Sequence, residues 1–313
     1  SRDQRILGNG KQLEGIMTIC SRFIRVLGSV CAALCLATVV QAGVVASYPN
    51  FCSTTGLTLV GSTTSSSCEL QLTSSGGSEA GAAYSTTAVS LGSNATFSTT
   101  FQFQITNPGG IDPADGIIFV LAASATGLGT SGGDLGYGGV PNSVAIEFDT
   151  YNNGADDGNS SNHIAIDENG NIINGTGESD QDLTNVYGVS TCNFTSGTLY
   201  TAPGCLSNGD IWSVTMAYNG TDLSLTASDP AEGGSDVIYN NLPINISSFL
   251  GTNTAFVGFT AGTGSGYETQ SILDWQFAND TSLATPEPAS LALIGSGLVG
   301  LASVGLRRKR KTV

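Results

Sequence analysis

Short runs that are either apolar throughout or alternate between apolar and polar residues recur between residues 44 and 279. An alternation with a period of two places every second side chain on one face, which is typical of a half-buried β-strand. Clusters of Gly, Asn, Asp and Ser separate the runs, as turns between antiparallel strands require. We therefore expect strands at Thr96–Ile105, Gly116–Ala122, Val144–Thr150, Ile211–Tyr218, Leu223–Ala227, Ala255–Thr260 and Ser271–Phe277, and a further strand that starts at His163.

The succession of these runs predicts one all-β domain over residues 43–279. No helical period of useful length, internal repeat or interior linker interrupts the pattern. Apolar residues make up 40% of the chain, which is enough to bury a core. The pattern is that of an antiparallel β-sandwich, and residues 280–288 form a short spacer after it.

Residues 17–42 have the organisation of a secretory signal peptide. Two arginines precede the apolar stretch Val26–Val40, and the small-residue ending predicts cleavage after Ala42. Residues 1–16 are treated as an upstream extension. The alternative interpretation is a hydrophobic helix that stays in the cytoplasm.

The C-terminal tail combines Pro-Glu-Pro at residues 286–288, an uncharged stretch at 289–306 and a basic cluster at 307–313. Eighteen helical residues at about 1.5 Å each span roughly 27 Å, so we expect a transmembrane helix. The basic cluster would stay in the cytoplasm, which leaves the domain outside. The tail resembles the PEP-CTERM sorting signals of Gram-negative bacteria, and a plain stop-transfer anchor is the alternative.

The resemblance of the tail has consequences for location and partners. It implies processing by an exosortase, commonly alongside exopolysaccharide production. With either interpretation of the tail, we expect an exported protein, periplasmic or at the cell surface, that is held in the inner membrane at least transiently.

Charge is distributed unevenly along the chain. All 10 Lys and Arg residues lie before residue 26 or after residue 306, whereas most of the 25 Asp and Glu residues lie between. Nucleic acid needs basic side chains and other anionic ligands generally do, so both are poor partners for this chain, and we expect no nucleic-acid binding. We expect bound metal cations to offset the repulsion between the carboxylates.

Four of the seven cysteines remain once the signal peptide is removed. Three connectivities are formally open to them. Short spacing and an oxidising compartment favour Cys52 with Cys68 and Cys192 with Cys205.

Carboxylates gather at residues 147–157. Glu147 and Asp149 are two residues apart on a predicted strand, so they share a face. A loop rich in Asn, Gly and Asp follows, and after it comes His163, the only histidine. Carboxylates, an amide and a carbonyl suit Ca²⁺, and an added imidazole suits Mn²⁺ or a similar metal. A lone histidine is more often an ordinary core or surface residue, but the acidic cluster favours a metal site.

This acidic loop resembles the metal loop of the L-type, or legume, lectins. The resemblance extends over most of the domain, in the ordered blocks Ala80–Tyr84, Phe97–Phe101, Ala114–Ile117, Gly132–Gly136, Trp212, Val257–Ala261 and Ile272–Trp275. It implies a concanavalin-like β-sandwich, or jelly roll, that binds glycans with the help of Ca²⁺ and a transition metal.

The resemblance also implies metal ligands. The transition metal would be held by Glu147, Asp149, Asp157 and His163, and Ca²⁺ by Asp149, the Tyr151 carbonyl, Asn153 and Asp157. Asp156 is the competing candidate, and its spacing is the less favourable. Two features depart from the family: Gly158 stands where a proline often follows the Ca²⁺ aspartate, and the strand after His163 lacks the serine that lies near the transition metal.

The sugar site is implied in the same way. Asp115, after a cis Ala114-Asp115 peptide, would accept hydrogen bonds from sugar hydroxyls, and the Asn153 amide and the Gly133 N–H would donate them. The Tyr151 ring would cover the apolar face of a pyranose. Ser265 and Gly266 belong to a stretch, 264–268, that matches the family's specificity loop.

Two other functions remain open. A glycoside hydrolase of this fold would need a second carboxylate three residues after Asp149, where Asn152 stands. A structural matrix or adhesion protein without sugar binding is the other alternative, and the presence of Asp115, Gly133 and Asn153 beside the metal ligands argues against it.

Overall fold

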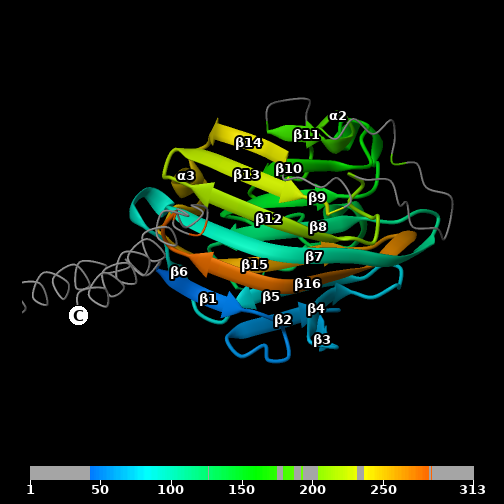
Figure 1. The fold of residues 1–313 in the computed structure, drawn as a ribbon, viewed down its shortest axis with the longest axis horizontal. Helices are drawn as coiled ribbons and strands as arrows, with labels where there is room; N and C mark the ends of the chain where they lie inside the picture. Colours follow the sequence, from blue (N-terminus) through cyan, green and yellow to red (C-terminus); the bar gives the residue numbers. More distant parts are fainter. Residues whose placement is uncertain are drawn as a thin grey trace, which may run out of the picture. The chain divides into compact units, whose positions relative to one another are not determined.

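Two antiparallel sheets of eight strands each form the domain, one layered on the other (Figure 1). The structure, a computed structural model, describes residues 43–125, 127–174, 179–186, 192, 204–230, 236–281 and 283. The predicted signal peptide and transmembrane tail lie outside this part of the chain. Within it, no helix is both long and apolar enough to cross a membrane. The all-β sandwich expected from the sequence is confirmed.

The first sheet contains the longest strands of the domain. Its order is β14 (Asp236–Pro243), β13 (Asp222–Ser228), β12 (Ile211–Tyr218), β7 (Phe97–Gly110), β16 (Gly266–Ala278), β4 (Glu69–Thr73) and β3 (Thr64–Ser66), with β1 (Val44–Tyr48) also paired to β16.

The second sheet carries the residues of the predicted site. Its order is β11 (Asp180–Asp182), β10 (His163–Glu168), β9 (Ser143–Asp149), β8 (Gly116–Ala122), β15 (Thr254–Gly262), β5 (Ala80–Ser85) and β2 (Leu57–Gly61), with β6 (Val89–Ser90) also paired to β15. Short helical turns connect some strands: η1 (Ser93–Ala95), η2 (Gly132–Asp134), η3 (Gly154–Asp156), α2 (Leu183–Val186) and α3 (Ile246–Leu250).

Strands β7 and β16 are longer than the sequence pattern indicated. β7 continues to Gly110 and β16 begins at Gly266, and these two residues pair. The stretch after Ile105 has the composition of a turn, which is why the strand was expected to end there. The register shifts in this region, and the resulting bulge accommodates Pro108 within a paired strand.

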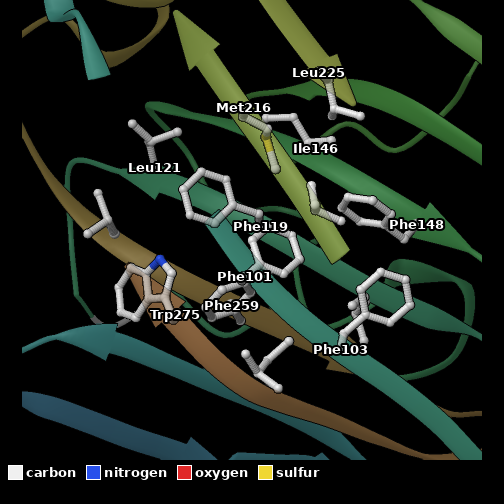
Figure 2. Close-up of a cluster of buried hydrophobic side chains, with 14 of the residues drawn as sticks. Phe101, Phe103, Phe119, Leu121, Ile146, Phe148, Met216, Leu225, Phe259 and Trp275 are labelled. Carbon is white, nitrogen blue, oxygen red and sulfur yellow. The ribbon is translucent and has the colours of Figure 1, made fainter. Parts of the chain in front are cut away.

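Aromatic side chains fill the space between the sheets (Figure 2). The ring of Phe101 lies 5.0 Å from that of Phe259, and the ring of Phe103 lies 5.4 Å from that of Phe148. All four residues, which come from both sheets, are at most 1% exposed. Burial of large apolar rings is the main force that holds the two sheets together.

A smaller apolar cluster covers the opposite face of the second sheet, which we call the outer face. Ile118 and Val120 of β8 and Ala145 of β9 pack there against Leu135 and Tyr137 of the long connection that follows β8. Both faces of β8 and β9 are therefore buried. Any polar side chain on the outer face of β9 is removed from water, which is costly unless it finds a partner.

Candidate functional site

Three polar side chains meet at one end of the outer face. In the sheet register, His163 of β10 lies opposite Asp149 of β9, and Asp149 lies opposite Gly116 of β8. Glu147, two residues before Asp149, lies on the same face. Strand pairing thus brings together residues that the sequence separates by a loop.

Glu147, Asp149 and His163 are arranged to share an ion. Each offers one ligand atom, and these atoms all lie within 4.8 Å of one another. His163 Nε2 lies 2.9 Å from Glu147 Oε1, and all three residues are at most 2% exposed. Two carboxylates and one imidazole are a donor set that suits Mn²⁺ or a similar transition metal. The residues therefore fit the ion that the sequence suggested.

Among the described residues, the carboxylates of this cluster have no Lys or Arg to pair with. Burial raises the pKa of Asp149 well above its usual range, and the carboxylates of Glu147 and Asp157 raise it further. Burial also lowers the pKa of His163. The part of the chain that the structure describes contains no Lys or Arg. A bound cation would supply the positive charge that these ionised carboxylates need.

The loop after β9 folds back on Asp149. The Asp149 carboxylate accepts a 2.7 Å hydrogen bond from the backbone N–H of Tyr151, and the Asp157 carboxylate accepts one from the backbone N–H of Asn153. Asp157 is 4% exposed, whereas Asp156 is exposed. Of the two neighbouring candidates for a metal ligand, it is Asp157 that is buried near Glu147 and His163, although its carboxylate is not among the ligand atoms that lie within 4.8 Å of one another.

Asp115 lies immediately before β8, beside this loop. Its peptide bond to Ala114 is cis, as expected. The N–H of Thr150 donates to the Asp115 carbonyl at 2.9 Å, which ties the loop to this residue. The side chain is 3% exposed, and its Oδ2 has no hydrogen-bond partner among the described residues. Burial, with the nearby Glu268 carboxylate, raises the pKa of Asp115 to about 7.

Glycines bring the other predicted sugar-binding residues together. A Cβ on Gly133 would come within 2.8 Å of the Asn153 side-chain amide, so only a glycine lets the amide lie there. A Cβ on Gly264 would come within 3.4 Å of Asp115 Oδ2. Four segments that are distant in sequence therefore converge on one small region, and Asp115, Gly133 and Asn153 all belong to it.

Ser265, Gly266 and Tyr151 border this region. Ser265 is exposed, and its carbonyl accepts a 3.2 Å hydrogen bond from the N–H of Ile111. Gly266 is buried against the side chain of Ala114. Tyr151 is half-buried and lines a surface depression with Asp112, Asn152 and Asn159.

The predicted specificity loop is shorter than expected. Residues 264–268 were expected to form a loop, but β16 begins at Gly266. Glu268 is fully buried: its carboxylate accepts 2.6 Å hydrogen bonds from the hydroxyls of Thr150 and Ser207. Gly266, Glu268 and Gln270 alternate with less buried residues, but polar residues occupy the buried positions, so no apolar alternation in the sequence marks this part of the strand.

Asp167 and Asn174 also join the metal cluster, although no role was predicted for them. Asp167 is 2% exposed, and burial together with the nearby Glu147 carboxylate raises its pKa well above the usual range. It follows His163 by four residues on β10, so the strand period places it on the same face. Asn174 contacts Glu147 through its side-chain amide, and no periodicity in the sequence predicts this contact.

Both predicted disulfides form, Cys52 with Cys68 and Cys192 with Cys205. The carbonyl of Cys192 accepts a 3.3 Å hydrogen bond from the hydroxyl of Ser161. The second disulfide therefore reaches the segment that connects the metal loop to β10.

Two family models match the chain. The model of the legume lectin beta-barrel domain matches residues 49–273, and the model of the PEP-CTERM protein-sorting motif matches residues 284–310.

Comparisons with individual proteins also find lectins. The chain is 30% identical to favin of Vicia faba over 202 residues, which cover 60% of this chain and 72% of favin. It is 29% identical to a lectin of Pisum sativum over 202 residues, which cover 61% of this chain and 64% of that lectin. A solved lectin from Bauhinia forficata, in complex with GalNAc, superposes with a TM-score of 0.59 at 24% identity, over 74% of this chain and 96% of that one. This last likeness is one of fold.

Proposed function

Since this chain belongs to the L-type, or legume, lectin family, we propose that it is an exported protein that binds carbohydrate in a Ca²⁺-dependent way. The observation that carries the proposal is the buried carboxylate of Asp115, whose Oδ2 has no partner among the described residues and lies beside two glycine-lined segments. A buried acceptor without a donor is costly. Hydroxyl groups of a sugar are donors of suitable size and spacing.

The proposed site uses the predicted residues in distinct roles. Asp115 accepts hydrogen bonds from adjacent sugar hydroxyls, while the Asn153 amide and the Gly133 N–H donate to the same sugar. The Tyr151 ring covers an apolar sugar face. The stretch with Ser265 and Gly266 borders the sugar and contributes to its selection.

Metal ions support this site. Glu147, Asp149, Asp157 and His163 would hold the transition metal, and Asp149, the Tyr151 carbonyl, Asn153 and Asp157 would hold Ca²⁺. When bound, the ions supply positive charge that neutralises the buried carboxylates and restrains the loop that carries Asn153. Support comes from the convergence of Glu147, Asp149 and His163.

The termini extend the proposal to the location of the protein. Residues 17–42 direct export, residues 43–279 form the lectin domain, residues 280–288 are a spacer and residues 289–306 hold the chain in the inner membrane until an exosortase acts on the tail. The match to the sorting motif supports this assignment. The glycan is then exopolysaccharide at the surface of a Gram-negative cell.

A binding assay on the full chain tests the function. The chain is purified in a detergent without sugar head groups and applied to mannose, galactose and exopolysaccharide columns with Ca²⁺ or with a chelator. We expect retention on at least one column in Ca²⁺ only. Asp115→Asn should weaken binding at least about 100-fold, since it removes the central charged acceptor.

The control is Asp156→Asn, which removes an exposed carboxylate one residue from Asp157 and should bind like the wild type. Absence of retention on every column would favour the structural matrix alternative. Turnover of β-glucans by the wild type would favour the hydrolase.

A further inference from the structure

The side chain of Asn174 lies inside the metal cluster, between Glu147 and His163. Its Nδ2 contacts Glu147 Oε1 and lies 3.5 Å from His163 Nε2. The residue is 7% exposed. Its backbone N–H donates a 2.7 Å hydrogen bond to the Asp156 carbonyl, and it forms a bridge with Asp157. Main-chain contacts with the metal loop therefore hold the amide in this position.

Without an ion, Glu147 Oε1 is the acceptor that His163 Nε2 and the Asn174 amide share. With its proton on Nε2, His163 donates to Glu147 Oε1 at 2.9 Å. The amide NH₂ of Asn174, also a donor, cannot then donate to the same ring nitrogen. Rotation of the amide by half a turn brings Oδ1, an acceptor, to this place. When Nε2 gives up its proton to solvent, a carboxylate oxygen, a ring nitrogen and an amide oxygen face one another, and a cation satisfies all three.

The two distances from His163 Nε2 agree with shared coordination. Ligands at right angles around an ion with bonds of about 2.1 Å lie roughly 3 Å apart. The Nε2 to Oε1 distance is 2.9 Å, and the distance from the amide to Nε2 is 3.5 Å. We propose that the side-chain oxygen of Asn174 is a further ligand of the transition-metal ion. This inference rests on the proposed metal-dependent function.

The ligand has consequences for which metal is bound. An amide oxygen is a hard, uncharged donor, and together with carboxylates it favours Mn²⁺ over softer ions. The strand after His163 lacks the serine that the family places near the transition metal, and Asn174 lies near His163 instead. The segment after β10 thus supplies a ligand of the ion through Asn174.

Mn²⁺ binding by the full chain, measured after metal removal and reloading with saturating Ca²⁺, tests the inference. The EPR signal of free Mn²⁺ reports the bound fraction. We expect Asn174→Ala to weaken Mn²⁺ binding about 10- to 100-fold, a range typical for loss of a group that supports a metal site. Asn174→Asp keeps an oxygen donor and should stay within about threefold of the wild type.

The matched control is Asn171→Ala, which removes an exposed amide three residues away on the same segment and should not change Mn²⁺ affinity. Thermal melting in Ca²⁺ verifies that each variant is folded. Equal Mn²⁺ affinity of folded Asn174→Ala and wild type would overturn the inference alone. A wild type that binds Ca²⁺ and sugar but no Mn²⁺ would overturn it and leave the lectin function standing, whereas a wild type that binds neither ion would overturn both.

Discussion

The two faces of β9 are equally buried but are stabilised in different ways. Val144, Ile146 and Phe148 point into the aromatic core between the sheets, whereas Glu147 and Asp149 point to the outer face. Burial of the apolar side chains stabilises the folded state whether or not metal ions are present. Burial of the carboxylates destabilises it unless a cation is bound. The inner, apolar face of β9 is therefore stable without metal ions, whereas its outer face needs them.

The largest effect on the free energy of unfolding should come from a substitution on the inner, apolar face of β9. Phe148→Ala leaves a cavity beside the rings of Phe101 and Phe103, and such truncations cost about 3–5 kcal/mol. We expect the same loss in Ca²⁺ and in chelator, measured by denaturant unfolding of the full chain. A loss that depended on Ca²⁺ would show that the two faces are not independent.

Removal of metal should have the next largest effect, because the outer face of β9 then loses the ions that stabilise it. An ion at 100 to 1,000 times its Kd stabilises the folded state by about 2.7–4.1 kcal/mol. Chelator should therefore lower the melting temperature by several degrees. Asp149→Asn should abolish this difference, and Asp156→Asn should preserve it. A melting temperature that stays the same in excess chelator would contradict the idea that ions stabilise the outer face.

The smallest effect should be a change in the pH dependence of stability. In the metal-free protein, burial raises the pKa of Asp115 to about 7, and that of Asp149 also rises. The folded state then binds protons more tightly than the unfolded state, so its stability increases as the pH falls through 7 toward the unfolded value near 4. Between pH 7 and pH 5.5 the gain from Asp115 should be about 2 kcal/mol, since one pKa unit corresponds to about 1.4 kcal/mol.

Metal-loaded protein should show the opposite trend, because protons compete with the ion for the same carboxylates. Melting temperatures at pH 5.5 and 8.5, with Ca²⁺ and with chelator, provide the comparison. A metal-free protein that is least stable at the lower pH would refute the assignment of unpaired buried carboxylates to the outer face.

Strands with a clear apolar pattern could be predicted from the sequence, and others could not. β8 and β12 form with the expected bounds and β9 within one residue of them, because a continuous apolar run in β8 and an apolar alternation in β12 mark where each strand begins and ends. β3, by contrast, consists of Thr64–Ser66, all exposed. It exists because its backbone pairs with β4, a contact that no local pattern reveals.

The same distinction applies to the site. Glu147, Asp149 and His163 could be found because the strand period and a short loop bring them together. Glu268 meets Thr150 across 118 positions of the chain, and Asn174 meets Glu147 across 27. These contacts depend on how distant segments pack, so they emerged only with the structure.

The absence of Lys and Arg from the domain has a practical consequence for the experiments above. Trypsin selects basic side chains through a carboxylate in its specificity pocket, and the chain has none between Arg25 and Arg307. A tryptic digest therefore leaves residues 26–307 in one piece, whether folded or unfolded. Resistance to trypsin gives no information on folding here, and opening of the loops on ion loss has to be followed with a protease that cuts after aromatic residues.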